Sequence, residues 1–449
     1  MKKVIFAALL LTVWTVAYAN PSEYQKAAEQ GMAEAQFDLG LCYNKGIGVD
    51  KDVAKAVEWY KKAADQGLAP AQYNLGLCYN NGDGVGKDAA KAVEWYRKAA
   101  DQGLAQAQNN LGLCYSQGDG VDRNATKAVE WFRKAAEQGF AQAQYALGMC
   151  YAQGDGVKQD YVKAVEWVKK AAEQGHAAAQ SSLGYSYAHG YGVDKDVVKA
   201  TEWYRKAADQ GYAMAQFNLG LCYDNGDGVD KDATKAFEWF GKAANQKLAA
   251  AQRALGVCYS RGNGVGKDTV KAVEWLQKAA DQGDATAQFN LGQCYNKGAG
   301  VDQNAVKAVE WYRKAAEQGF AQAQCNLGVR YSRGEGVDKN AVKAAEWYRK
   351  AADQGYAMAQ CNLGMCYDNG DGVDKDPTKA IEWYSKAADQ GYAIAQYALG
   401  ICYLRGNGVN SNEVNATYWL QKAAMQGDTN AQLVLDKIRP KWLQPGAHN

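Results

Sequence analysis

The chain has 449 residues, of which 22% are charged, and its 51 basic and 49 acidic residues leave a formal net charge of +2. Both signs are interspersed along the sequence, which argues against nucleic acid or an anionic membrane surface as a partner. A globular chain of this length usually forms two or three domains. Here an internal repeat predicts one continuous solenoid instead.

The N-terminus has the pattern of a secretory signal peptide over residues 1–19. Two lysines are followed by an apolar run over residues 4–16 and by a small-x-small cleavage site that ends at Ala19. The run is too short to span a bilayer, which needs about 20 residues. Asn20 stands where a lipid-anchored protein would have a cysteine. We predict cleavage after Ala19 and a neutral mature protein that is periplasmic or secreted.

A short helix is expected next, within an N-terminal capping segment over residues 20–32. Pro21 occupies the first helical position and Glu23 follows in the first turn, as at many helix starts. The segment mimics the second half of a repeat, so it should cover the first repeat.

From residue 33 to 428 the sequence repeats every 36 residues without insertion or deletion. The pair Leu39-Gly40 marks the first of eleven copies. Its glycine recurs at Gly76, Gly112, Gly148, Gly184, Gly220, Gly256, Gly292, Gly328, Gly364 and Gly400. Residues 429–449 hold a partial copy with Asp436 in place of the glycine, which predicts a C-terminal capping helix and tail. A fixed period in this range is typical of stacked helical repeats.

Each copy is predicted to fold as two helices. In the first copy, apolar residues at helical spacing predict a helix over residues 33–44, ended by Gly46. The second helix begins at the N-cap Asp52, a position that is Asp or Asn in all eleven copies, and closes at Gly67. Lys247 replaces that closing glycine in one copy and should distort the turn.

Large apolar side chains and a recurring charge pair should hold the helices together. Leu39, Tyr43 and Trp59 are predicted to fill the layer between helices. Glu58 and Lys62 have the spacing of an i,i+4 ion pair, which predicts a ladder of such pairs along the stack.

Eleven cysteines in an exported chain first suggest disulfides. Nine of them share one repeat position, which Ser186 and Arg330 fill in the other two copies, while Cys325 and Cys361 share another. Equivalent positions in neighbouring repeats lie farther apart than the ~7 Å that a disulfide can span between Cα atoms. We therefore predict buried free thiols.

The pattern AxAQxxLGxCYxxGxGVxxDxxKAxEWxxKAAxQG, followed from residue 33 to about residue 432, resembles the Sel1-like repeat, a relative of the tetratricopeptide repeat. The resemblance implies an all-α, right-handed superhelical solenoid of antiparallel helix pairs. It also implies a scaffold for protein–protein contacts. Bacterial members with signal peptides are linked to envelope function, signalling or host interaction.

By analogy with tetratricopeptide repeats, the ligand would face the equivalents of Glu34, Phe37, Leu41, Asn44 and Lys45, which vary between copies. Aromatic residues and arginines recur there, and these are typical anchors for a peptide or protein segment. The candidate groove residues are Phe37, Tyr73, Tyr145, Tyr185, Phe217, Arg253, Arg261, Phe289, Arg333, Tyr397 and Arg405. A glycan would also suit this wall. The alternative is that the aromatic rings fill gaps between neighbouring first helices.

Motifs for catalysis are missing from the sequence. The histidines of the mature chain, His176, His189 and His448, lack HExxH spacing, and neither GxSxG nor SxxK occurs. We predict no enzyme activity, no metal site and no cofactor. One branch of the resembling family carries two bridged cysteines per repeat and is credited with β-lactam binding or hydrolysis, but this chain lacks that pair.

The predicted function is an exported scaffold that binds a protein or peptide partner along a concave groove, in envelope function or host interaction. No nucleic-acid partner and no membrane-embedded part are expected. The alternative is a β-lactam-binding or β-lactam-hydrolysing protein, or a peptidoglycan-binding protein of the cell wall.

Overall fold

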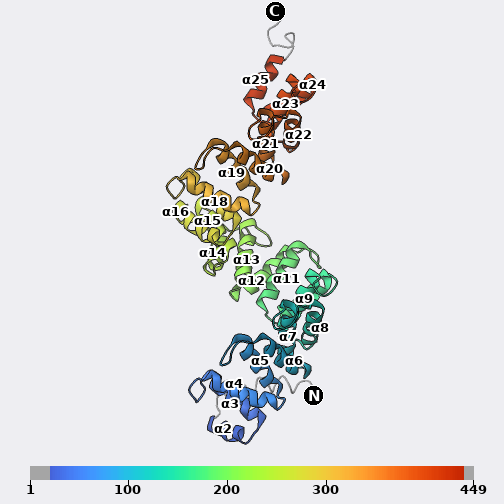
Figure 1. Ribbon diagram of the computed structural model, residues 1–449, viewed down its shortest axis with the longest axis vertical. Coiled ribbons are helices and arrows are strands. Elements are labelled where there is room, and N and C mark those ends of the chain that lie inside the picture. The colour runs from blue at the N-terminus through green and yellow to red at the C-terminus, as the bar shows by residue number, and fades with distance from the viewer. Residues whose placement is uncertain (1–20, 439–449) are drawn as a thin grey trace, which may run out of the picture. The chain divides into compact units, whose positions relative to one another are not determined.

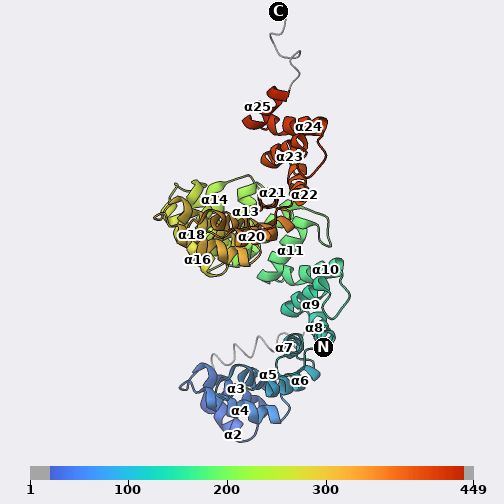
Figure 2. The same cartoon turned by 45° about the horizontal axis from the view of Figure 1, so that its top comes forward.

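The computed structural model describes residues 21–438, so the predicted signal peptide and the tail after residue 438 lie outside the described residues. Every regular element in the described range is an α-helix. Contacts divide the chain into two compact units, Met1–Lys231 and Asp232–Asn449. Within each unit, helices follow one another in chain order (Figures 1 and 2).

Each repeat contributes a first helix and a second helix of 13 residues each. The first helices are α3 (Ala33–Lys45), α5 (Ala69–Asn81), α7 (Ala105–Gln117), α9 (Ala141–Gln153), α11 (Ala177–His189), α13 (Ala213–Asn225), α15 (Ala249–Arg261), α17 (Ala285–Lys297), α19 (Ala321–Arg333), α21 (Ala357–Asn369) and α23 (Ala393–Arg405). The second helices are α4 (Val53–Asp65), α6 (Ala89–Asp101), α8 (Ala125–Glu137), α10 (Tyr161–Glu173), α12 (Val197–Asp209), α14 (Ala233–Asn245), α16 (Thr269–Asp281), α18 (Ala305–Glu317), α20 (Ala341–Asp353), α22 (Pro377–Asp389) and α24 (Glu413–Met425).

Shorter helices cover the two ends of the array. The helix α2 (Pro21–Glu29) packs on α3, and α25 (Thr429–Ile438) packs on α24. Within each unit, a first helix packs against the second helix of its own repeat, and that second helix packs against the first helix of the next repeat. The prediction of an all-α solenoid of helix pairs with capping helices is confirmed.

The second helices begin where the sequence predicts. The carboxylate of Asp52 accepts a hydrogen bond from the backbone N–H of Lys55 at 3.0 Å, which satisfies one of the free amides of the first turn. The same bond is accepted by Asp88, Asn124, Asp160, Asp196, Asp232, Asp268, Asn304, Asn340, Asp376 and Asn412. The N-cap prediction holds in all eleven copies.

The inter-helix loop contains two glycines that are needed for different reasons. Gly46 ends the first helix in a left-handed conformation, with φ 73°, and donates its N–H to the carbonyl of Cys42. The later glycine lies against the preceding repeat: a Cβ on Gly84 would come within 2.4 Å of the carbonyl oxygen of Val53. From the second repeat onward, each loop therefore rests on the start of the previous second helix and fixes the spacing between repeats.

Lys247 keeps the turn that glycine makes elsewhere. Its φ is 64°, and it is the one non-glycine residue with positive φ among residues 21–438. The prediction of a distorted turn is therefore wrong, because the turn stays left-handed. The lysine is strained instead, since its Cβ crowds the following carbonyl.

The core of a repeat is a leucine, a ring and small residues. Leu39 and Tyr60 are each 1% exposed, and a Cβ on Gly40 would lie 2.7 Å from the Tyr60 ring, so the glycine is what lets the two helices meet. Trp59 is only half-buried, and Lys62 Nζ lies 3.9 Å from the centre of its ring.

The predicted ladder of glutamate–lysine pairs is therefore wrong for most copies. Among the described residues, one such pair forms, Glu94–Lys98 at 2.8 Å. The recurring contact of this lysine is a cation–π contact with the tryptophan three residues before it, as in Lys134 over Trp131 at 3.9 Å.

A glutamine clasp, which the sequence analysis did not assign, joins consecutive repeats. Gln72 Nε2 donates to the carbonyl of Ala64 in the previous repeat at 3.1 Å. Gln102 Nε2, just after α6, donates to Gln72 Oε1 at 2.8 Å. Because Gln72 is buried, its amide needs both partners, and the pair ties three helices at each joint.

Candidate functional site

The predicted groove residues lie on first helices, five in the first unit and six in the second. At the position of Phe37 the rings are half-buried against the paired second helix. Ring centres are 5.8 Å apart for Phe37–Tyr60, 5.9 Å for Tyr73–Tyr96 and 5.8 Å for Phe289–Tyr312. These aromatic residues therefore take part in packing within the repeat, as the alternative interpretation expects, and their contact with a ligand stays a prediction.

The remaining aromatic members are also partly covered. The hydroxyl of Tyr145 lies 3.4 Å from Ser182 Oγ, and its ring centre is 5.0 Å from that of His176. Phe217 is half-buried, and Tyr397 packs against the cluster around Leu420. Tyr185 is different, because it is 48% exposed.

The basic members have two kinds of surroundings. Arg253 Nε lies 3.0 Å from Asp284 Oδ2 and links α15 to the start of α17. Arg261, Arg333 and Arg405 are exposed last residues of first helices, where a cation is favoured by the helix dipole. The structure thus does not bring all predicted residues together as one wall of a site.

Exposed apolar side chains occupy neighbouring positions of first helices. They belong to the repeat positions of Glu34 and Leu41, which were expected to face the ligand, although only Tyr185 among them was a predicted candidate. They are Leu113, Met214, Met358, Met365 and Ile394, together with Tyr185. For Met214, Met358 and Ile394, the signal that could have identified them is a large apolar residue at the repeat position where other copies carry polar residues such as Glu34, Gln106 and Gln142.

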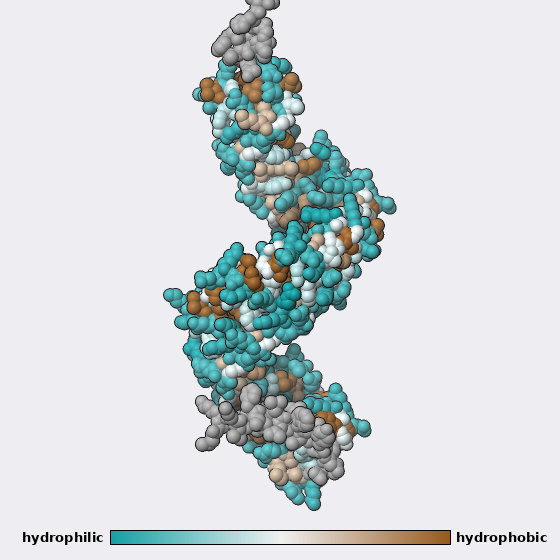
Figure 3. Space-filling view, turned by 180° about the vertical axis from the view of Figure 1, so that it is seen from behind, coloured by the Kyte–Doolittle hydropathy of each residue, from teal (hydrophilic) through white to brown (hydrophobic). Residues whose placement is uncertain are grey.

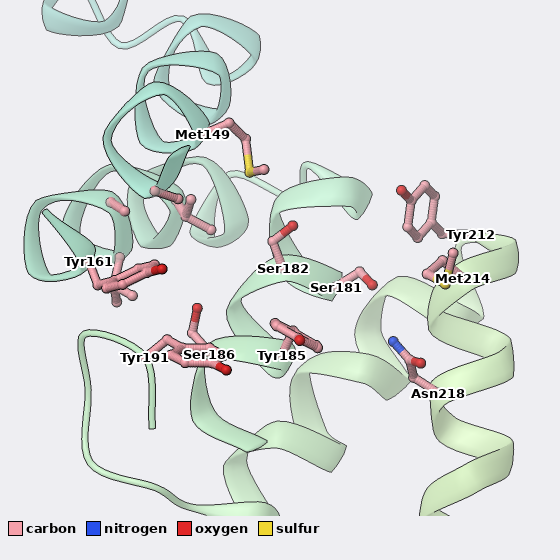
Figure 4. A pocket seen from close by; sticks show the side chains of 14 residues that line it. Met149, Tyr161, Ser181, Ser182, Tyr185, Ser186, Tyr191, Tyr212, Met214 and Asn218 are labelled. Carbon is pink, nitrogen blue, oxygen red and sulfur yellow. The ribbon is translucent and has the colours of Figure 1, made fainter. Parts of the chain in front are cut away.

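A pocket of about 520 Å³ opens beside Tyr185 in the first unit. It is lined by Met149, Ala152, Tyr161, Ala164, Val165, Val168, Ser181, Ser182, Tyr185, Ser186, Tyr191, Tyr212, Met214 and Asn218. Figure 4 shows Tyr161 and Tyr191 on one side of the pocket, Tyr212 and Asn218 on the other, and Ser182 between them.

Small residues at three core positions open this pocket. Val168 stands where the second helix of the first repeat carries Tyr60, and Ser186 replaces the recurring cysteine. Ser181 replaces the ring found at Phe37. All three line the pocket, so the volume is the space that these side chains leave empty.

An aromatic cluster borders the opening. The rings of Tyr161 and Tyr191 are stacked with centres 5.4 Å apart, and the ring centres of Tyr185 and His189 are 4.1 Å apart. His189 is also parallel to Tyr191, with an interplanar angle of 6°. Tyr161, Tyr185 and Tyr191 are each more than 40% exposed, so their faces are accessible to a ligand.

The cysteines show no sign of nucleophilic chemistry. All eleven are free in the structure, as predicted, and nine are buried. Burial raises the pKa of the Cys325 and Cys361 thiols to about 12, so the reactive thiolate is rare near neutral pH. Within residues 21–438, no group of three or more His, Cys, Asp or Glu side chains could hold a metal ion.

A family model described as the Sel1 repeat matches residues 24–32 and then every 36-residue copy from 33–68 to 393–428. The chain belongs to the Sel1 repeat family. Sel1 repeats generally form non-catalytic scaffolds that mediate protein interactions. Among the described residues, no helix combines the length and hydrophobicity that a membrane span requires.

Two solved Sel1 repeat structures are similar over much of the chain. One is c5321 of Escherichia coli, described as a protective antigen present in uropathogenic strains: it is 42% identical, with a TM-score of 0.79, covering 94% of this chain and 92% of that one. The other is a Sel1 repeat protein from Oxalobacter formigenes, 37% identical with a TM-score of 0.54, covering 69% of this chain and 90% of that one. None of the curated proteins compared with the chain matches it.

Proposed function

We propose that the protein is an exported Sel1 repeat scaffold that binds an extended segment of a protein partner along the exposed face of its first helices. The observation that carries this proposal is the set of exposed apolar side chains on that face, represented by Leu113, Met214 and Ile394. Apolar side chains of this size contribute binding energy when a partner covers them, and they are unfavourable in water.

Figure 3 shows that the face seen there is largely hydrophilic, with hydrophobic side chains scattered over it. Within the second unit, Met358 and Ile394 occupy equivalent positions of consecutive repeats, so one extended segment can contact both.

Two features support export and a role at the cell envelope or in contact with a host. The N-terminal sequence has the order of a signal peptide, with lysines, an apolar run and a small-x-small site at Ala19. The likeness to a protein described as a protective antigen of uropathogenic strains supports the same proposal. No observation on the described residues favours the alternative β-lactam or peptidoglycan activity.

A matched pair of variants tests the binding face. The first changes Leu113, Met214, Met358 and Ile394 to Ser on first helices. The control changes Val198, Val270, Val306 and Val342 to Ser, which are more exposed than the first set but lie on second helices. Envelope extract is passed over each immobilised protein, and the bound proteins are identified by cross-linking and mass spectrometry.

We expect a partner that is recovered with wild type and control and lost with the first-helix variant. Equal recovery with both variants, or loss with the control alone, would contradict the proposed face. Export is tested separately: cell fractionation should find the protein outside the cytoplasm with its N-terminus at Asn20, and an uncleaved cytoplasmic protein would contradict it.

A further inference from the structure

We propose that the pocket beside Tyr185 binds an uncharged aromatic side chain of the partner segment, together with part of its adjacent main chain. The inference rests on the proposed function, because it assigns one anchor point on the same face. It adds a ligand chemistry and a location within the fourth to sixth repeats.

The size of the pocket fits such an anchor. Its volume of about 520 Å³ lies within the range of ~300–1,000 Å³ of pockets that enclose compact ligands. The space exists because two adjacent helices carry small residues at core positions that face the same volume. Val168 belongs to α10, whereas Ser181 and Ser186 belong to α11. All three side chains line the open volume.

The lining selects against charge. None of its 14 residues is acidic, basic or histidine. A carboxylate or an ammonium group placed there would lose water without gaining an opposite charge, which is unfavourable. The loop contributes to this neutrality, because Tyr191 stands where the neighbouring repeats carry Asp155 and Asp227.

Aromatic residues at the opening favour an aromatic ligand. Tyr161 replaces the small residues Ala125 and Val197 of the neighbouring repeats, and its ring stacks with that of Tyr191. Exposed tyrosine faces and edges pair well with a further ring at offset or perpendicular geometry. The sulfurs of Met149 and Met214, which also line the pocket, make favourable contacts with ring edges.

Polar groups are few and suit a main chain or an indole. Ser181 is buried, and Ser182 and Asn218 are half-buried, so the pocket presents hydroxyl and amide groups beside an apolar floor that includes Val165 and Val168. A peptide amide or an indole N–H needs one or two such partners. A sugar carries many hydroxyls and would leave most of them unpaired against this floor.

The test uses N-acetyl-fluorotryptophan amide as a probe, observed by fluorine NMR with the purified chain. Wild type should broaden the probe signal in a saturable way. Val168→Tyr places in the pocket the residue that Tyr60 and Tyr96 supply elsewhere, and we expect binding about tenfold weaker or absent. Leu276→Tyr makes the corresponding change at the same repeat position of the second unit and should bind like wild type.

A second variant guards against a folding defect. Tyr191→Asp restores the residue of the neighbouring loops at an exposed position, so it should weaken probe binding while circular dichroism stays unchanged. No binding to wild type, or equal binding to wild type and Val168→Tyr, would overturn the inference. Stronger Val168-dependent binding of a chitooligosaccharide than of the probe would overturn the aromatic assignment.

The two proposals fail in different ways. If envelope capture succeeds on the first-helix face but the probe does not bind, the aromatic anchor is wrong and the scaffold proposal stands. If the probe binds in a Val168-dependent way but capture shows no first-helix dependence, the scaffold proposal is wrong.

Discussion

The junction between the second and third repeats and the junction between the fourth and fifth repeats use the same backbone with different fillings. In the former, Tyr96 is 2% exposed and belongs to one core cluster with Leu111 and Cys114 of the third repeat, while its ring lies against Gly76 of its own repeat. In the latter, Val168 holds that position and the space beside Ser186 is open. The N-caps Asp88 and Asp160 that begin the two second helices are alike.

This difference shows which parts of the repeat carry the fold and which are free to vary. Caps, loop glycines and the glutamine clasp fix the helix positions, so a core side chain can be removed without changing the path of the chain. Stability in such arrays is approximately a sum over repeats and their interfaces. One weakened interface is therefore tolerated, and the vacated volume becomes available for a ligand.

Replacing Tyr96 by the valine found at the open junction should have the largest effect on stability. Tyr96→Val removes a buried ring, and we expect a loss of about 2–4 kcal/mol in the free energy of unfolding of that region. Hydrogen exchange of α6 and α7 measures it locally, because unfolding of a long repeat array need not be two-state. Tyr418→Val is the control, since Tyr418 is half exposed and should cost little. Equal effects of the two changes would mean that the ring does not hold the junction.

A charged residue on the first helix of the first repeat gives a third comparison, at a different repeat position. Asp38 occupies the repeat position of Asn110 and Ser182, and burial, aided by the charge of Glu34, raises its pKa to about 6. A carboxyl group with a raised folded-state pKa favours the protonated form, so its penalty is absent below pH ~4 and complete above pH ~6. Asp38→Asn should therefore stabilise the first repeat by about 1 kcal/mol at pH 7, a value reduced for partial solvent exposure, and change nothing at pH 4.

The reciprocal change provides the control for that prediction. Asn110→Asp should introduce a smaller loss of stability at neutral pH at the filled junction, because the uncharged Gln106 stands at the repeat position of Glu34. Thermal unfolding of both variants from pH 4 to pH 8 measures the effect. A pH-independent gain for Asp38→Asn would show that the carboxylate charge is not the cause.

A smaller effect on stability is expected where one repeat differs from the others in the residue that makes a left-handed turn. Lys247 has a φ of 64° in a turn where the other repeats use glycine. Lys247→Gly relieves left-handed strain but increases the freedom of the unfolded chain, so the net gain should be about 0.5–1 kcal/mol. Urea unfolding measures it, and Lys231→Gly, at an exposed residue with ordinary φ, should instead destabilise slightly.

The features that form within a single repeat, such as helix starts and ends, could be predicted from the sequence. The N-cap at Asp52 and the helix end at Gly46 depend on short-range chemistry, so both could be predicted. Lys62 was misassigned because its choice between Glu58 and the Trp59 ring depends on side-chain packing that the spacing does not reveal. The pocket was missed for a related reason.

Ser186 was visible as an exception among the cysteines, but its meaning depends on Val168, which lies on the preceding helix. The two residues form one cavity only because both line it from opposite sides of the repeat boundary in the sequence. The groove prediction had a similar limit. Variation between copies does not show whether a side chain is packed, as Phe37 is on Tyr60, or exposed, as Tyr185 is at the repeat position of Leu41.

Thiol reactivity should separate the two junctions without changing stability. Cys114 and Cys150 occupy the same repeat position, and burial raises the pKa of both thiols to about 11, so their thiolate fractions at pH 8 are similarly small. Cys114 is buried whereas Cys150 is half-buried, so Cys150 should react faster with iodoacetamide in the native protein because of access alone. Val168→Tyr, which fills the space next to α9, should reduce that difference.

Mass spectrometry of the labelled peptides measures both rates, and labelling in denaturant without reductant should modify all eleven cysteines. Faster labelling of Cys114 would mean that the filled junction opens more readily than the hollow one. The hollow junction would then not be the more accessible of the two.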